Sequence, residues 1–436
     1  MKIKGIILAL VLAFVGSAHV MAQMDKWQNI HTVKKKETIF GISRMYGITI
    51  DELIDANPDM RKPEYELQKG ATLFIPFHKE KEVKTVEPVA KPEPKSVSVG
   101  VMLPLHNVDG DGKRMIEYYR GMLLAVNDLK QKGINVNVKA FNVNQEADVR
   151  KILTENDMVK LDFIFGPLYT VQVAEMGNFC RMSNVKMVIP FSISSNEVDY
   201  NPMVYQVYQT QETLTEHSID YFMKRFSDAH PIFVDCNDST SKKGIFTFGL
   251  RKQLEGKGIQ YNITNITSSD AMFAKAFDAT KNNVVILNSG ASPKLTQVIR
   301  KLDALKAANP GLNISLYGYQ EWLMYQKYNN NEVNFPKYDT YIPSTFYYDE
   351  SMPSTRSFIA KYRNAYHSEL QTGYLEHFAL TGYDQAMFFL GRKVGETFIP
   401  LQTNYHFTQA SAASGFRNNN YQLIHFTANG VESIRY

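Results

Sequence analysis

The sequence predicts two folded parts, a small β-α-α-β module near the N-terminus and a large α/β body with parallel strands. Three observations indicate this division. The chain has 436 residues, which is more than one ordinary domain of about 150 residues. A segment without aromatic residues, 78–96, separates two apolar regions. Beyond it, apolar strands alternate with amphipathic helices, a pattern typical of a parallel sheet covered on both faces.

Composition and charge exclude several classes of protein. Hydrophobic residues make up 44% of the chain and charged residues 21%, which excludes a disordered or collagen-like protein. Lys and Arg exceed Asp and Glu by 48 − 44 = 4, so the net charge gives no case for nucleic acid or an anionic membrane as a partner. Two cysteines build no disulfide framework. We expect Cys180 and Cys236 to be buried thiols in different parts of the body, with a bridge between them as the alternative.

The N-terminus predicts export. Lys2 and Lys4 precede an apolar run, 5–15, that is shorter than the roughly 20 residues needed to span a bilayer. Small residues then offer a cleavage site before Gln23. We therefore expect residues 1–22 to be a signal peptide and the mature protein to be exported without a membrane span.

The small module is expected over residues 31–76, in the order strand, helix, helix, strand. Apolar side chains recur at helical spacing over 38–46, and Gly47 follows in the position that ends many helices. Thr49 and Glu52 form a capping box that begins a second helix. The run TLFIP then returns as a strand. A unit of this size without disulfides needs a strict packing of these four elements.

The segments HTVKKKETIFGISRMYGITIDELIDANP and LQKGATLFIP together resemble a LysM domain. LysM domains bind glycans that contain N-acetylglucosamine, chiefly peptidoglycan, in a shallow groove between two turns. On this chain the resemblance implies a groove lined by Lys36, Glu37, Thr38 and Ile39 on one side and by Asn57, Pro58, Asp59 and Met60 on the other. Lys36 departs from the family, which commonly has glycine there. The alternative for Thr38, Asn57 and Pro58 is a purely structural role as cap and turn residues.

A spacer is expected over residues 78–96. It contains five Lys, four Glu and three Pro, too few apolar groups to fold. Proline holds such a segment extended at about 3.1 Å per residue, so the spacer would reach roughly 50 Å.

The body is expected to be a βα-alternating domain over residues 97–436. A helix with one apolar face is indicated around 119–129, and Thr213 with Glu216 forms a capping box for another. Apolar runs predict strands over 97–104, 136–143, 162–168, 185–192, 231–236, 258–265, 284–288 and 314–318, and a terminal strand over 422–436.

The order of several body segments resembles the type I periplasmic binding proteins, in particular the branched-chain amino-acid receptors. The segments are SVGVMLPLHN, EYYRGMLLAVNDL, FIFGPLYT, VKMVIPFSISSN, MVYQVYQTQE and FALTGYDQAMFFLG. This resemblance implies a two-lobed α/β fold with parallel sheets. Lobe one would comprise about 97–211 and 343–413, and lobe two about 212–342 and 414–436.

The same resemblance implies a ligand cleft between the lobes, at the carboxyl ends of the strands. Polar groups of lobe one would hold a ligand carboxylate, and Glu321 of lobe two would hold an ammonium group. The lobe-one residues are Tyr169, Thr170, Ser192, Ser194 and Ser195. No aromatic residue stands near Leu287, where receptors of this family close over an amino acid, and this argues against an amino-acid ligand. The alternative for the serines is helix capping.

The sequence contains no complete enzyme motif. The motif S-x-x-K at Ser239 lacks its companion motifs, and no zinc, nucleotide or hydrolase motif occurs, so we expect no catalysis, cofactor or metal. The sequence thus predicts a periplasmic, wall-associated, non-enzymatic protein that binds peptidoglycan through its LysM domain. The body would bind a small polar ligand or an envelope protein, with regulation of wall synthesis as one such role. The alternative is the substrate-binding receptor of an amino-acid-type ABC transporter.

Overall fold

The computed structural model of the chain describes residues 27–62, 64–77, 95–191, 193–372 and 376–436. The chain divides into two compact units, residues 1–93 and 94–436, and each has a core of its own. The expected signal peptide and residues 78–94 of the expected spacer lie outside the described residues. Ser96 already belongs to the first strand of the body, so the spacer ends earlier than expected.

The small module has the predicted order of elements. They are β1 (Asn29–Thr32), α2 (Ile39–Met45), α3 (Ile50–Ala56), the 3₁₀ helix η1 (Pro58–Arg61) and β2 (Thr72–Ile75). The two strands pair antiparallel, with Ile30 opposite Phe74. The capping box at Thr49 is confirmed, and Gly47 has a φ of 68° after α2. The core consists of Val33, Ile42, Ile48, Leu53, Met60, Leu73 and Ile75.

Lobe one of the body is built on a seven-stranded sheet in the order β13-β14-β7-β6-β5-β3-β4. Every pairing in it is parallel except that of β13 with β14. Its strands are β3 (Ser96–Leu103), β4 (Asn135–Asn142), β5 (Phe163–Phe165), β6 (Lys186–Ile189), β7 (Val204–Gln206), β13 (Phe407–Gln409) and β14 (Phe416–Asn418).

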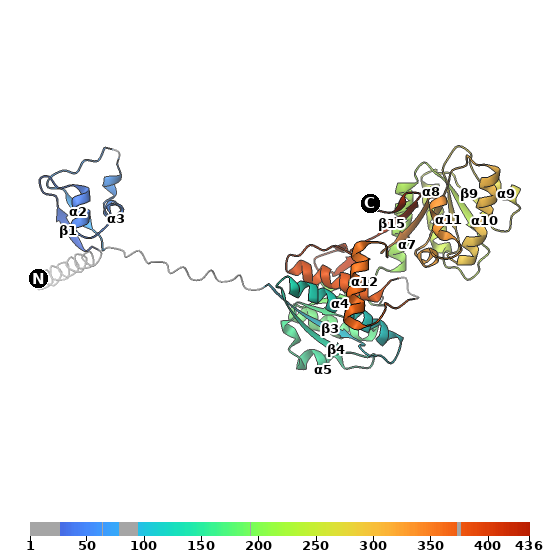
Figure 1. Cartoon of the computed structure of the whole chain (residues 1–436), viewed down its shortest axis with the longest axis horizontal. Coiled ribbons are helices and arrows are strands. Elements are labelled where there is room, and N and C mark those ends of the chain that lie inside the picture. The colour runs from blue at the N-terminus through green and yellow to red at the C-terminus, as the bar shows by residue number, and fades with distance from the viewer. Residues whose placement is uncertain (1–26, 63, 78–94, 192, 373–375) are drawn as a thin grey trace, which may run out of the picture. The chain divides into compact units, whose positions relative to one another are not determined.

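Helices cover both faces of this sheet, as the continuous apolar strands predict. On one face α4 packs against α13 and α12, and on the other α5 packs against α6 (Figure 1). The helices of lobe one are α4 (Gly110–Gln131), α5 (Val149–Glu155), η2 (Met158–Lys160), η3 (Thr170–Gln172), α6 (Val173–Ser183), η4 (Glu197–Asp199), α12 (Pro353–Tyr366), α13 (Phe378–Ala386) and the π-helical turn η6 (Met387–Gly391).

Lobe two is built on a second seven-stranded sheet, in the order β16-β15-β12-β11-β10-β8-β9. Its strands are β8 (His230–Asp235), β9 (Asn262–Asn265), β10 (Asn283–Leu287), β11 (Ile314–Tyr317), β12 (Thr340–Ser344), β15 (Gln422–Thr427) and β16 (Gly430–Ile434). Its helices are α7 (Gln211–Arg225), α8 (Gly244–Gly256), α9 (Asp270–Ala274), α10 (Ser292–Ala308), η5 (Gln320–Tyr325) and α11 (Asn331–Lys337) (Figure 1). The central strands are parallel, and β15 and β16 add an antiparallel edge.

The chain crosses between the two sheets at residues other than those expected. β12 includes Pro343 and belongs to lobe two, so the chain enters lobe one only after Ser344. β14 belongs to lobe one, so the return to lobe two comes after Asn418. The C-terminal segment is a hairpin of β15 and β16 instead of one strand, because the turn around Gly430 reverses the chain. The three crossover segments are joined at Asn420, whose O accepts from the Gln209 amide and whose Nδ2 donates to Thr345 O.

Two further local predictions can be compared with the structure. The N-cap of α7 is Thr210, whose hydroxyl accepts a hydrogen bond from Thr213 N. The prediction that Thr213 caps this helix is therefore wrong, because the helix begins about one turn earlier. Cys180 in lobe one and Cys236 in lobe two are buried free thiols, which confirms the unpaired interpretation.

Candidate functional site

The first side of the expected glycan groove is the turn between β1 and α2. Lys36 is exposed and has a φ of 72°, in the left-handed region. The Thr38 hydroxyl accepts a hydrogen bond from Gly41 N at 3.0 Å and so caps α2. Ile39 is partly buried against the core of the module. The turn therefore presents Lys36 and Thr38 to solvent while Ile39 holds it in place.

Glu37 has partners within the module itself. Its Oε2 accepts hydrogen bonds from Lys34 N at 2.6 Å and from His31 Nε2 at 2.8 Å. The bond from the Lys34 amide, followed by that from His31, lowers the pKa of the Glu37 carboxyl below its ordinary value. The Glu37 carboxylate thus fixes the turn on the first side of the expected groove.

The second side follows α3, and its residues have unequal exposure. Pro58 occupies the first position of η1 and is exposed. Asp59 is exposed and pairs with Lys62 at 2.6 Å, a contact that lowers the pKa of Asp59 and raises that of Lys62. Met60 is 8% exposed and belongs to the core. Asn57 is equally buried and hydrogen-bonds to Phe74 and Leu53.

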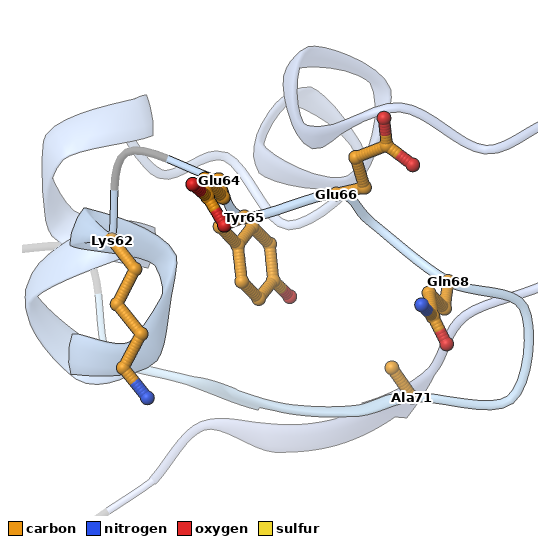
Figure 2. Close-up of a pocket in the computed structure, with 6 residues that line it drawn as sticks. All are labelled: Lys62, Glu64, Tyr65, Glu66, Gln68 and Ala71. Carbon is orange, nitrogen blue, oxygen red and sulfur yellow. The ribbon is translucent and has the colours of Figure 1, made fainter.

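A pocket that sequence reasoning missed lies between η1 and β2. It has a volume of about 540 Å³, and the Tyr65 ring points into its centre (Figure 2). Its lining residues are Lys62, Glu64, Tyr65, Glu66, Gln68 and Ala71. An aromatic face with surrounding polar groups suits a sugar ring and its hydroxyl and N-acetyl substituents. The signal in the sequence is a tyrosine within the polar run KPEYELQKG, outside any helical or strand pattern.

Lys36 gives a stability prediction for the module. A non-glycine residue in the left-handed region costs about 1–2 kcal/mol, whereas glycine adopts this region freely but loses more entropy on folding. Lys36→Gly should therefore raise the free energy of unfolding by about 0.5–1 kcal/mol. Denaturant unfolding followed by circular dichroism measures this change. The matched control is Lys35→Gly, an exposed neighbour outside the left-handed region, which should lower stability. A loss of stability in both variants would contradict the prediction.

The lobe-one residues expected to hold a ligand lie after β5 and β6, and the structure brings two of them together. The Thr170 hydroxyl accepts from Ser194 N at 3.3 Å. The Ser195 hydroxyl accepts from Glu197 N at 3.1 Å, within a turn. The Tyr169 hydroxyl donates to Asp111 at 3.3 Å. Ser192 lies outside the described residues.

The lobe-two residue Glu321 lies beside a second pocket, with a volume of about 400 Å³. Its carboxylate pairs with Lys243 at 2.7 Å. The Tyr319 hydroxyl donates to the carbonyl of Leu287, so an aromatic ring does reach this place, from the next strand along the sheet. Tyr169, Thr170 and Ser194 do not line this pocket. Among the described residues, this pocket therefore contains the lobe-two member of the expected cleft without its lobe-one members.

Two general features concern membranes and metals. Within the described ranges, no helix combines the length and the apolar character needed to cross a membrane. The same residues contain no group of three or more His, Cys, Asp or Glu side chains arranged to hold a metal ion.

Comparisons with known proteins address the two units separately. Residues 31–76 match the LysM domain model. No curated protein matches the sequence. Among solved structures, the chain is similar to a protein from Rhodospirillum rubrum described as a branched-chain amino acid ABC transporter, with 12% identity and a TM-score of 0.53, covering 78% of this chain and 100% of that one.

Two other solved structures are amino-acid complexes. One is an ABC transporter substrate-binding protein from Desulfitobacterium hafniense with Leu, at 12% identity, coverage of 78% and 100%, and a TM-score of 0.40. The other is a branched-chain amino acid transporter substrate-binding protein from Streptococcus pneumoniae with isoleucine, at 15% identity, coverage of 78% and 99%, and a TM-score of 0.36.

At these identities the similarity shows the fold, and the Rhodospirillum rubrum structure is the basis for that assignment. Residues 31–76 are therefore a LysM domain, and the body that follows has the α/β fold of the type I periplasmic binding proteins.

Proposed function

We propose that this protein is an exported, non-enzymatic peptidoglycan-binding protein whose LysM domain holds wall glycan while its body binds a ligand or partner. The observation that carries the proposal is the LysM domain at residues 31–76. It is supported by the pocket around Tyr65, which offers an aromatic face and polar groups in one place. The glycan class would be one that contains N-acetylglucosamine.

The exposed groups of the module are those that we expect to contact the glycan. Lys36, Thr38 and Asp59 are exposed, and the Asp59–Lys62 ion pair joins the expected groove to the pocket of Tyr65. Glu37 and Asn57 would act through the fold, because their polar atoms already bind other parts of the module. Met60 would support the groove from the core.

For the body, we favour an envelope protein as the partner over a small ligand. One lobe-one donor that a carboxylate would need, the Ser194 N–H, already donates to the Thr170 hydroxyl oxygen. A receptor tethered to the wall also searches only a small volume, which suits a fixed partner better than delivery to a transporter. The alternative, a substrate-binding receptor of an amino-acid-type ABC transporter, is supported by the fold similarity to the Rhodospirillum rubrum protein.

Pelleting with purified, insoluble peptidoglycan tests the LysM part. The mature chain should pellet, and a chain that begins at residue 95 should stay in the supernatant, because the body is a compact unit without the module. Tyr65→Ala should weaken pelleting at least tenfold. Tyr328→Ala, which changes an exposed tyrosine of the body, is the matched control and should have no effect. Equal pelleting of the body alone would overturn the proposal.

A thermal-shift screen with amino acids separates the two functions of the body. A ligand that binds only the folded state raises the melting temperature as its concentration exceeds the Kd. The partner function predicts no shift with any of the amino acids. A shift of several degrees for one amino acid, lost in Thr170→Ala, would instead establish the receptor alternative.

A further inference from the structure

Lys243 places its ammonium group in a small site made by two other side chains. Its Nζ lies 2.7 Å from Glu321 Oε1 and 4.5 Å from the centroid of the Tyr319 ring. A carboxylate beside an aromatic face is the combination that binds a primary ammonium group, because both present negative potential to it. We call Tyr319 and Glu321 the ammonium site.

The ammonium site lies where ligands bind in this class of sheet. Lys243 follows β8, and Tyr319 follows β11, so both come after the carboxyl ends of strands that flank β10. The pocket there, of about 400 Å³, is within the size range of small-molecule sites. The site is therefore a wall of the cleft that open parallel sheets use for ligands.

The fold buries the ring of the ammonium site and leaves room for its carboxylate. The Tyr319 ring is 7% exposed and meets the Trp322 ring edge-on at 6.0 Å. A Cβ added at Gly290 would lie 2.1 Å from Glu321 Oε1, so the glycine leaves the carboxylate free to lie where it meets Lys243. An aromatic face that is fixed before binding needs little reorganisation to accept an ammonium group.

The neighbouring lysine shows that this placement is specific to one side chain. Lys242 lines the same pocket and is exposed, whereas Lys243 is only 27% exposed and makes both the ion pair and the ring contact. The two lysines are adjacent in the sequence and carry the same charge, but they differ in their contacts. They therefore form a matched pair for experiments.

We propose that Lys243 is a built-in occupant of this ammonium site. While Lys243 stays in place, this part of lobe two excludes ligands with a primary amino group, including free amino acids. The inference goes beyond glycan binding and does not depend on it. It identifies Lys243 as the residue that determines specificity at this wall.

Chemical rescue tests the proposal on the mature chain. Lys243→Ala removes three carbons and the ammonium nitrogen, which n-propylammonium replaces atom for atom. This ion should bind the variant at least tenfold more tightly than it binds the wild type or Lys242→Ala, measured by calorimetry. The neutral probe n-propanol should show no such gain, and Lys243→Ala with Glu321→Gln should lose the response to the cation. Equal binding of n-propylammonium to the Lys242 and Lys243 variants, or equal binding of both probes, would overturn the proposal.

A second experiment needs no loss of the lysine. An acetylating reagent, followed by mass spectrometry, should modify Lys243 at least tenfold more slowly than Lys242 in the wild type. Glu321→Gln should abolish most of this protection, because the carboxylate that holds the ammonium is gone. Unchanged protection in Glu321→Gln would show that Lys243 is shielded by position alone and would overturn the proposal.

Discussion

Replacing Asn57 by alanine should remove most of the stability of the LysM domain. The Asn57 side chain is 8% exposed and makes three hydrogen bonds at 2.8 Å: its Nδ2 donates to Leu53 O and Phe74 O, and its Oδ1 accepts from Phe74 N. The amide therefore pairs with both backbone groups of Phe74, as a third strand would, and ties β2 to the end of α3.

The expected loss of stability follows from the backbone groups that lose their hydrogen-bond partner in Asn57→Ala. A buried backbone N–H without a partner costs about 1–3 kcal/mol, and each other hydrogen bond contributes about 1 kcal/mol, so Asn57→Ala should cost about 3–5 kcal/mol. A domain of residues 31–76 has a total stability of only about 2–7 kcal/mol at typical values per residue. Thermal unfolding by circular dichroism should show the loss, and pelleting with peptidoglycan should fall with it.

Asp59→Ala is the control for this prediction. Asp59 is exposed and its ion pair with Lys62 is a surface contact, so the variant should keep the fold within about 0.5 kcal/mol. Any loss of pelleting in Asp59→Ala would then report on glycan contact. If Asn57→Ala keeps the wild-type melting temperature but no longer pellets, Asn57 contacts the glycan directly and our structural interpretation is wrong.

Most of the fold could be predicted because its signals are local. The capping box at Thr49 and the glycine after α2 need only neighbouring residues, and the buried strands of the body are continuous apolar runs. The strands that were missed lack this signal. β12 contains Pro343, and β7, β13 and β14 are three-residue strands that include polar side chains.

The candidate sites were harder to predict because they depend on contacts between distant residues. Asn57 stands before a proline and could be expected as a turn residue, but its bonds to Phe74 follow only from the docking of β2. Tyr319 reaches Leu287 from another strand, so a search near Leu287 in the sequence finds no aromatic residue. Likewise, nothing in the sequence around Glu321 indicates that Lys243 is its partner.

Asp384 provides the second prediction of large effect, in the body. This residue of α13 is fully buried, and its carboxylate accepts hydrogen bonds from Leu401 N at 2.8 Å, Gln402 N at 2.9 Å and Thr403 N at 2.8 Å. The Gln402 carbonyl in turn accepts from Tyr347 N, in the segment that crosses from β12 to lobe one. The carboxylate therefore holds the segment 401–403, which supports this crossover.

Asp384→Ala should lower the free energy of unfolding of the body by about 3–6 kcal/mol, because it leaves two buried N–H groups and one part-buried N–H group without an acceptor. Asp384→Asn keeps the shape and one acceptor oxygen but turns an NH₂ group toward a backbone donor, so it should cost about half as much. Denaturant unfolding of a chain that begins at residue 95, whose single tryptophan is Trp322, measures the order wild type, Asn, Ala by fluorescence.

Asp349→Ala is a suitable control, since the Asp349 carboxylate accepts hydrogen bonds from Ser351 within a turn of the same crossover and should cost less than about 1 kcal/mol. Because Asp384 acts through backbone donors and not through a charged partner, high salt should leave its contribution nearly unchanged. An alanine variant as stable as the asparagine variant would mean that the three donors find other acceptors or water, and that the carboxylate does not hold the crossover.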